Sequence, residues 1–281
     1  MLFSSITFLY CFLPCVLLVY FAVPDRMKNL VLLLASLLFY GWGEPKYLVF
    51  MLASVTQSYI AALLVERFRG TRIAKLALAV SAVASLGLLA YCKYADFFIG
   101  NFNAVTGLSI PLLKVALPVG ISFYTFQTMS YVIDVYQKKY EPETNIFRLA
   151  LFTAYLPQLL QGPIGRYDRL APQLFEPHDF NLKNIEYGAQ RIAWGLAKKL
   201  ILADRAYVFS KAVFADLNTY SGMYVIVALL TFSIYEYCDF SGGIDVVIGV
   251  SELFGIRLDE NFRQPYFSKS IGEFWRRWHI T

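Results

Sequence analysis

The sequence predicts an all-α fold, a polytopic bundle of transmembrane helices. Hydrophobic residues make up 58% of the 281 positions and charged residues only 16%, against about 25% charged residues in ordinary soluble domains. The apolar residues gather in runs that approach the roughly 20 residues a helix needs to cross a bilayer. A soluble domain of this size could not cover its surface with so few polar side chains. We therefore expect one membrane domain over residues 1–281, with the lipid bilayer as its surroundings.

The apolar runs set the expected helices in chain order. Seven spans are predicted, near 5–23, 29–42, 46–64, 73–95, 115–136, 187–209 and 222–238, and two shorter apolar pieces lie at 146–161 and 244–256. The first run lacks the basic start and the small-residue cleavage site of a signal peptide, so we expect it to be retained as a helix.

Basic loop residues predict the orientation, because cytoplasmic loops carry an excess of Lys and Arg. Such residues follow the first, third and fifth spans, at 26–28, 67–75 and 138–148. The three loops agree with one another. Together they place the N-terminus outside the cell and these loops in the cytoplasm.

The piece at 146–161 is expected to be a half-length or re-entrant element. If it crossed the membrane, the basic stretch 166–191 would lie outside, against the other loops. Non-helical backbone at this depth is tolerated only where it is buried in protein or lines a wet cavity. We therefore expect a cavity near Gln158, Gln161 and Gly162-Pro163, with residues 239–281 on the cytoplasmic side or dipping in from it.

Several function classes are not supported. The net charge of +5 is spread over loop clusters rather than a basic stripe on a soluble domain, so nucleic acid is not an expected partner. The four cysteines show neither zinc spacing nor a disulfide framework, so no metal site is expected. No glycine-rich phosphate loop or serine nucleophile elbow occurs.

The last residues carry the densest chemistry. Ser270 followed by Glu273 is a capping-box pattern, which predicts a helix that begins at Ser270. No helix stop signal follows, so this helix is expected to be interrupted at Thr281 and the chain to be the front part of a longer membrane enzyme. On such a helix His279 would share a face with Trp275, four residues earlier.

His279 is the candidate catalytic base. Histidine suits base catalysis near neutral pH, and the flanking Arg276 and Arg277 would keep it neutral and could hold phosphates. An interfacial belt of aromatic and basic residues with an incidental histidine is the alternative. The other histidine, His178, lies in a polar loop beside a proline and is expected to be exposed.

Further polar candidates lie close to apolar runs. The segment 235–245 holds three acids, among them Asp239, and ionisable residues at membrane depth are functional candidates. Gly242 and Gly243 permit a break or a close backbone approach there. A turn at a helix end is the alternative. Arg166 follows the predicted cavity, although charge on a cytoplasmic loop would explain it equally well.

Eight segments along the whole chain carry a family resemblance. They are MLFSS at 1–5, FYGWGEP at 39–45, PVGISFYTFQ at 118–127, PQLLQGPIGR at 157–166, PQL at 172–174, YCDFSG at 237–242, NFRQPY at 261–266 and FWRRWH at 274–279. Together they resemble the membrane-bound O-acyltransferase (MBOAT) family, and in particular its bacterial branch that includes the alginate O-acetylation protein.

The resemblance implies a function. Such proteins pass an acyl group from a cytoplasmic donor through a funnel to an acceptor. It implies acetyl transfer, with acetyl-CoA as the donor and no bound cofactor. The acceptor would be an exported polysaccharide or an extracytoplasmic acyltransferase partner, and the location a bacterial inner membrane.

The resemblance also assigns roles to residues. His279 matches the first of two family histidines and would be the base or its helper; the second lies downstream in a His-Gly context, and no residue here matches it. The residues implied in substrate binding are Arg166, Arg276 and Arg277 on the donor side, Gln161 at the funnel, and Asp239, Ser241 and Asn261 in a polar network. Gly243-Ile244 departs from the family pattern, because relatives often carry a Tyr followed by a small or hydroxyl residue at these two positions.

Two other interpretations stay open. Discontinuous helices with buried acids also occur in channels and transporters; inverted repeats would favour that class, and none is seen. The chain could also be an inactive fragment, because the second histidine is absent. Flux through reconstituted vesicles without consumption of acyl-CoA would decide for a transporter.

Overall fold

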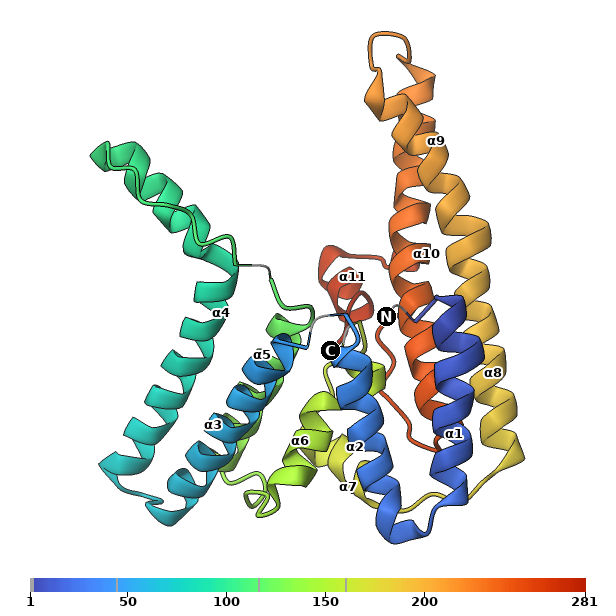
Figure 1. Cartoon of the computed structure of the whole chain (residues 1–281). Coiled ribbons are helices and arrows are strands. Elements are labelled where there is room, and N and C mark those ends of the chain that lie inside the picture. Colours follow the sequence, from blue (N-terminus) through green and yellow to red (C-terminus); the bar gives the residue numbers. More distant parts are fainter. Residues whose placement is uncertain (1–2, 44, 116, 160) are drawn as a thin grey trace. The chain divides into compact units, whose positions relative to one another are not determined.

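The structure, a computed structural model, describes residues 3–43, 45–115, 117–159 and 161–281, and it is helical almost throughout (Figure 1). The helices are η1 (Thr7–Phe12), α1 (Leu13–Ala22), α2 (Asp25–Gly41), α3 (Tyr47–Arg67), α4 (Arg72–Thr106), α5 (Ile121–Tyr136), α6 (Ile146–Ala154), η2 (Leu156–Gln158), α7 (Tyr167–Phe175), α8 (Leu182–Ala197), η3 (Lys198–Ala203), α9 (Asp204–Ala215), α10 (Met223–Leu253), η4 (Pro265–Phe267) and α11 (Ile271–Arg277). The motif positions Met1, Leu2, Glu44 and Leu160 lie outside the described residues. The all-α prediction is confirmed.

The chain divides into two compact units. The terminal unit comprises Met1–Lys28, Gln161–Gly165 and Glu176–Thr281, and the central unit comprises Asn29–Leu160 and Arg166–Phe175. The single membrane domain expected from composition stays a prediction.

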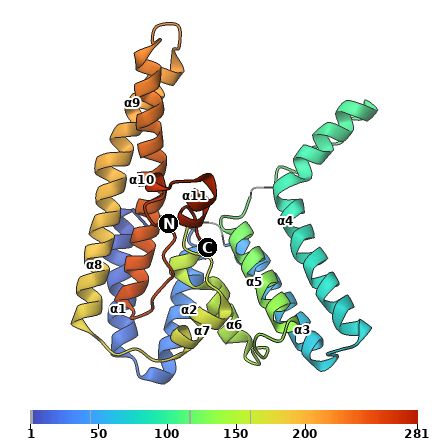
Figure 2. The same cartoon turned by 180° about the vertical axis from the view of Figure 1, so that it is seen from behind.

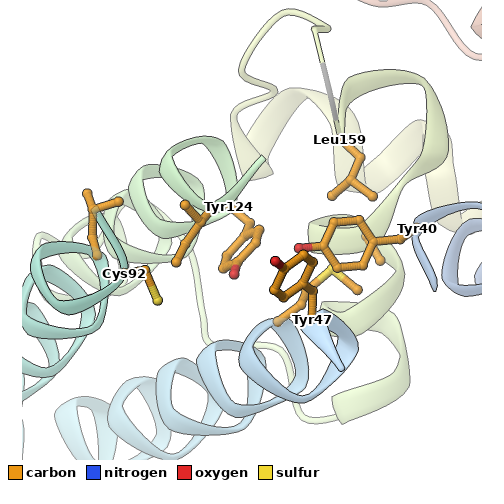
Figure 3. Packing of buried hydrophobic residues seen from close by; sticks show 9 residues of the cluster. Tyr40, Tyr47, Cys92, Tyr124 and Leu159 are labelled. Carbon is orange, nitrogen blue, oxygen red and sulfur yellow. The ribbon is translucent and has the colours of Figure 1, made fainter. Parts of the chain in front are cut away.

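In the central unit, α3 packs against α4 and α5. Figure 3 shows the buried cluster at their ends, where the rings of Tyr40 and Tyr124 meet edge to face at 6.5 Å. Gly120, at the start of α5, has a φ of +76°, and a Cβ there would lie 2.5 Å from the Leu159 carbonyl oxygen. Only glycine fits this position, which accounts for one residue of the PVGIS segment.

The apolar piece expected at 146–161 contains a short helix and a turn, and its re-entrant path in a membrane stays a prediction. Helix α6 has nine residues, too few to cross a bilayer, and the turn η2 follows it. Gln158 is buried, and its side-chain amide donates to the Phe152 carbonyl at 2.9 Å. The Phe152 carbonyl near the end of α6 is therefore paired with a protein donor.

In the terminal unit, α10 lies along α8 and α9 (Figure 2). The backbones of α8 and α10 touch at two glycine pairs: a Cβ on Gly195 would lie 2.5 Å from the Gly242 carbonyl oxygen, and one on Gly188 would lie 2.7 Å from that of Gly249. The prediction of separate pieces at 222–238 and 244–256 is wrong, because α10 runs unbroken through Gly242 and Gly243. The glycines here serve close helix packing rather than a break.

Three described helices, α3, α4 and α10, are long and apolar enough to cross a membrane. The stretch Thr7–Ala22 is apolar but shorter. The spans expected at 29–42 and 115–136 appear as α2, with 17 residues, and α5, with 16, both below the roughly 20 residues of a full span.

Helix α11 begins where capping predicts and ends earlier than expected. The Ser270 hydroxyl accepts from the Glu273 amide at 3.2 Å. The helix stops at Arg277, because Trp278 turns extended and forms an antiparallel bridge with Phe262. The expectation that His279 lies on this helix, on the face of Trp275, is therefore wrong.

Candidate functional site

A basic cleft of about 760 Å³ opens in the terminal unit. It is lined by Arg191, Trp194, Lys198, Tyr237, Ile244, Asp245, Glu260, Phe262, Arg263, Gln264, Arg276 and Arg277. Five of these side chains are cationic and two are acidic, so the cleft carries a net positive charge. Such a surface favours an anionic ligand.

Asp245 is the centre of an ion network at the base of the cleft. Its side chain is buried, and its Oδ1 lies 2.8 Å from Arg191 Nε and 2.7 Å from Arg191 Nη2. Lys198 pairs with the other carboxylate oxygen and also donates to the Ser241 hydroxyl at 3.0 Å. Arg191 reaches out of the network to Glu260, at 2.7 Å. A buried carboxylate requires such partners, because an unpaired charge in this environment is strongly unfavourable.

Helix packing places these charges. Arg191 and Lys198 follow Gly188 and Gly195 by three residues, and Asp245 follows Gly242 by three. Residues three apart share a helix face, so the face that brings α8 against α10 also carries the two cations to the aspartate.

The last residues of the chain form the rim of the cleft. Arg277 pairs with Glu273 at 2.6 Å, and its carbonyl accepts from the Arg263 amide at 2.9 Å. The Lys269 amide donates to Glu273, and this contact, with the Arg277 charge, lowers the pKa of that carboxyl. Arg276 is exposed and is available to a ligand.

His279 lies beside the cleft, in the segment after α11. Two ring contacts connect the histidine to the cleft. Phe262, which lines the cleft, packs on Phe240 with ring centroids 5.1 Å apart, and Phe240 meets the His279 ring edge to face at 5.1 Å. His279 is exposed, but this contact desolvates part of the ring, which lowers the pKa of the imidazole. At pH 7 the ring is therefore neutral and can accept a proton.

Asn261 holds the histidine. It is completely buried, and its Oδ1 lies 3.3 Å from His279 Nδ1 and accepts from the Thr281 amide at 3.0 Å. Because an amide oxygen only accepts, Nδ1 must carry the proton and Nε2 keeps its lone pair. Among the described residues, no partner is found for the buried Nδ2 of Asn261.

The other predicted site residues are dispersed. Ser241 is buried beneath Lys198, whereas Asp239 pairs with Lys199 on a partly exposed surface outside the cleft lining. Gln161 lies against Gly243, where its Oε1 would be 2.8 Å from an added Cβ. Arg166 belongs to the central unit, where its carbonyl accepts from the Leu170 amide as α7 begins.

Sequence reasoning missed Arg191, Lys198 and Glu260. Arg191 stands at the end of the basic stretch 166–191, which indicates only orientation, and Glu260 precedes Asn261 without any periodic signal. The seven-residue interval shared by Gly188 and Gly195 and by Arg191 and Lys198 is the signal that could have found the network. Within the described ranges, no group of three or more His, Cys, Asp or Glu side chains is placed to hold a metal ion.

Comparisons with known proteins agree on one family. The model of the family described as MBOAT, membrane-bound O-acyltransferase family, matches residues 142–281. A probable alginate O-acetylase AlgI of Pseudomonas syringae pv. tomato is 38% identical over 286 residues, which cover 100% of this chain and 55% of that protein. A peptidoglycan O-acetyltransferase of Helicobacter pylori is 33% identical over 312 residues, with 100% and 59% covered.

A more distant relative covers part of the chain. A teichoic acid D-alanyltransferase of Bacillus subtilis is 28% identical over 168 residues, which cover 58% of this chain and 42% of that protein. The chain spans 55% and 59% of the length of the first two relatives. Their activities are therefore guides to a proposal for this chain.

Proposed function

Since this chain belongs to the membrane-bound O-acyltransferase (MBOAT) family, we propose that it is a membrane-embedded O-acetyltransferase. The donor is acetyl-CoA, bound from the cytoplasm without a resident cofactor. The acceptor is a hydroxyl group of an exported polysaccharide or of an extracytoplasmic acyltransferase partner. Relatives named for alginate and for peptidoglycan support a polysaccharide as the final acceptor.

The observation that carries the proposal is the basic cleft beside His279. Its volume of about 760 Å³ falls in the range of about 300–1,000 Å³ of small-molecule sites. Arg276 and Arg277 at the rim are suited to the phosphates of the donor, because arginine pairs with phosphate through two parallel hydrogen bonds. The ring contacts through Phe262 and Phe240 bring this anion site next to a neutral imidazole.

The chemistry is a single acyl transfer. His279 Nε2 takes the proton of the acceptor hydroxyl as its oxygen attacks the thioester carbonyl carbon. The new C–O bond forms and the C–S bond breaks. The imidazolium returns its proton to the leaving thiolate, which departs as coenzyme A. Asn261 keeps Nδ1 protonated, so that Nε2 is the nitrogen that acts.

The proposal extends to the surroundings of the site. The chain lies in a bacterial inner membrane as a multi-pass protein, with half-length elements around a central funnel. Residues 239–281 face the cytoplasmic donor. The short α6 and its buried turn support the half-length elements, and Gln161 next to Gly243 is the candidate residue of the funnel wall.

Acetyl transfer by the protein expressed from its own gene tests the proposal. Inner-membrane vesicles with labelled acetyl-CoA should transfer label to polysaccharide, and His279→Ala should abolish the transfer. His178→Ala is the matched control, because His178 lies outside the cleft lining, and it should retain wild-type rates. Undiminished transfer by His279→Ala would remove the histidine from the mechanism, and absence of any transfer by the wild type would refute the activity.

A further inference from the structure

Polar contacts, together with one link along the chain from Glu260 to Asn261, join the buried ion network to His279. Asp245 forms an ion pair with Arg191, and Arg191 Nη2 lies 2.7 Å from Glu260 Oε2. The next residue along the chain is Asn261, whose Oδ1 lies 3.3 Å from His279 Nδ1. The series runs from the interior of α10, through α8, to the imidazole.

The segment that carries Glu260 and Asn261 has no helix of its own. Residues 256–261 are irregular between α10 and the bridge at Phe262. Backbone hydrogen bonds join the segment to residues 277–280 on one side, with Ile280 N donating to Asn261 O at 3.1 Å. On the other side, the Arg191–Glu260 pair connects it to α8. At the start of the segment, the Ile256 amide donates to the Ser251 carbonyl at 3.2 Å and the Ser251 hydroxyl donates to the Ile256 carbonyl at 2.8 Å. An irregular segment depends on such contacts, since no helical ladder fixes it.

We infer that Arg191 and Glu260 are positioning residues for His279: their ion pair fixes the segment 256–261 so that Asn261 reaches the imidazole. The inference rests on the proposed function of His279 as the base. Arg191 is suited to the task, because its planar guanidinium can engage Asp245 and Glu260 at once. Asn261 is at the limit of hydrogen-bond distance from Nδ1, so a small shift of the segment breaks that contact.

A direct contact of Glu260 with the donor would predict a rise in KM for acetyl-CoA when Glu260 is replaced, whereas the charge of Glu260 by itself predicts the reverse. Glu260 is one of the two acids that line the cleft. Removing its charge leaves the cleft more positive, which favours the anionic donor and lowers KM. Misplacement of a catalytic group by about 1 Å can cost about 100-fold in rate. Positioning therefore predicts a fall in kcat without a rise in KM.

The kinetic test is Glu260→Gln in the protein expressed from its own gene. We expect kcat for acetyl transfer to fall at least tenfold, with KM for acetyl-CoA unchanged or lower. Glu252→Gln is the matched control, because Glu252 pairs with Arg257 at 3.5 Å outside the cleft lining, and it should retain wild-type constants. A rise in KM with unchanged kcat would overturn the inference.

A chemical readout separates this inference from the proposed function. Diethylpyrocarbonate modifies neutral imidazole, and mass spectrometry of the peptides gives the rates at His279 and His178 in the same purified protein. Release of the segment should raise the rate at His279 several-fold relative to His178 in Glu260→Gln and not in Glu252→Gln. This holds even if no acetyl transfer is detected. An unchanged ratio would refute the positioning role.

A second variant covers the case in which Glu260→Gln does not fold. Arg191→Lys keeps the positive charge beside Asp245, but a lysine ammonium cannot bridge two carboxylates as the guanidinium fork does. It should also raise the relative modification rate of His279. Wild-type reactivity in Arg191→Lys would contradict the inference.

Discussion

Replacing Gly195 by alanine tests the contact between α8 and α10. The added Cβ would lie 2.5 Å from the Gly242 carbonyl oxygen and 2.8 Å from the Val246 amide nitrogen, whereas ordinary contacts begin at 3.4 Å. Both neighbours are backbone atoms, so no side chain can move aside. The two helices would have to separate by roughly 0.9 Å at this point, and overpacking of this kind costs about 1–3 kcal/mol.

The helix propensity of alanine offsets part of this cost. Alanine is favoured over glycine in a helix by about 0.8–1.0 kcal/mol. The net loss in free energy of unfolding is therefore about 0–2 kcal/mol, and relative to an alanine that meets no neighbour the loss is about 1–3 kcal/mol. Circular dichroism of the purified protein, unfolded reversibly by SDS in mixed micelles, measures it.

Gly100→Ala supplies the comparison. Gly100 lies inside α4, and nothing is within 4 Å of a Cβ built there. Its variant should gain up to about 1 kcal/mol from propensity alone. If Gly195→Ala proved as stable as Gly100→Ala, the helices would not be in backbone contact, and the packing described for the terminal unit would be wrong.

Acetyl transfer should fall on acidification with a midpoint below pH 6.5, because partial burial lowers the pKa of His279 and only the neutral ring is a base. The unfolded chain binds this proton more tightly than the folded one. The folded state therefore also loses stability as the pH falls through this range. The profile of kcat/KM against pH reports the pKa of the free protein, and a midpoint above 6.5 in it would disagree. Arg276→Gln should raise KM for acetyl-CoA about tenfold with kcat unchanged, since one charge-assisted contact contributes about 1.5–3 kcal/mol. Steady-state kinetics measure the change in KM. Arg257→Gln is the control, because Arg257 lies outside the cleft lining, and it should not change KM. Asp245→Ala leaves two cations without their buried partner and should cost about 3–5 kcal/mol in the SDS unfolding assay, whereas the exposed Asp168→Asn should be neutral.

Local signals in the sequence predicted the helices well. Hydropathy predicted a span at 46–64, and α3 runs over Tyr47–Arg67, so both ends agree within three residues. The short apolar piece at 146–161 predicted a short helix, and α6 has nine residues, because length and hydropathy belong to the segment itself. Ser270 and Glu273 predicted the start of α11 through a contact between residues three apart.

Contacts between distant segments could not be predicted in this way. Gly242 and Gly243 are compatible with a break or with close packing, and only α8, more than forty residues earlier, decides between them. Likewise, α11 ends at Arg277 because Trp278 pairs with Phe262, a partner sixteen residues away. The same contact explains why the prediction that His279 lies on a helix is wrong, while its role as the base stays a prediction.

Close packing and charge pairing in the terminal unit depend on each other. Backbone contact at Gly195 and Gly242 brings α8 and α10 close enough for Lys198 and Asp245, three residues later, to pair, and both side chains are largely buried from water. With less water the attraction between the two charges is stronger, and leaving either unpaired becomes more costly. The glycines therefore set the register in which the ion network closes, and the network in turn opposes any slip of α8 along α10. Because Arg191 extends that network to Glu260, the rigidity of two packed helices is transmitted to an irregular segment that could not hold a histidine in place by itself.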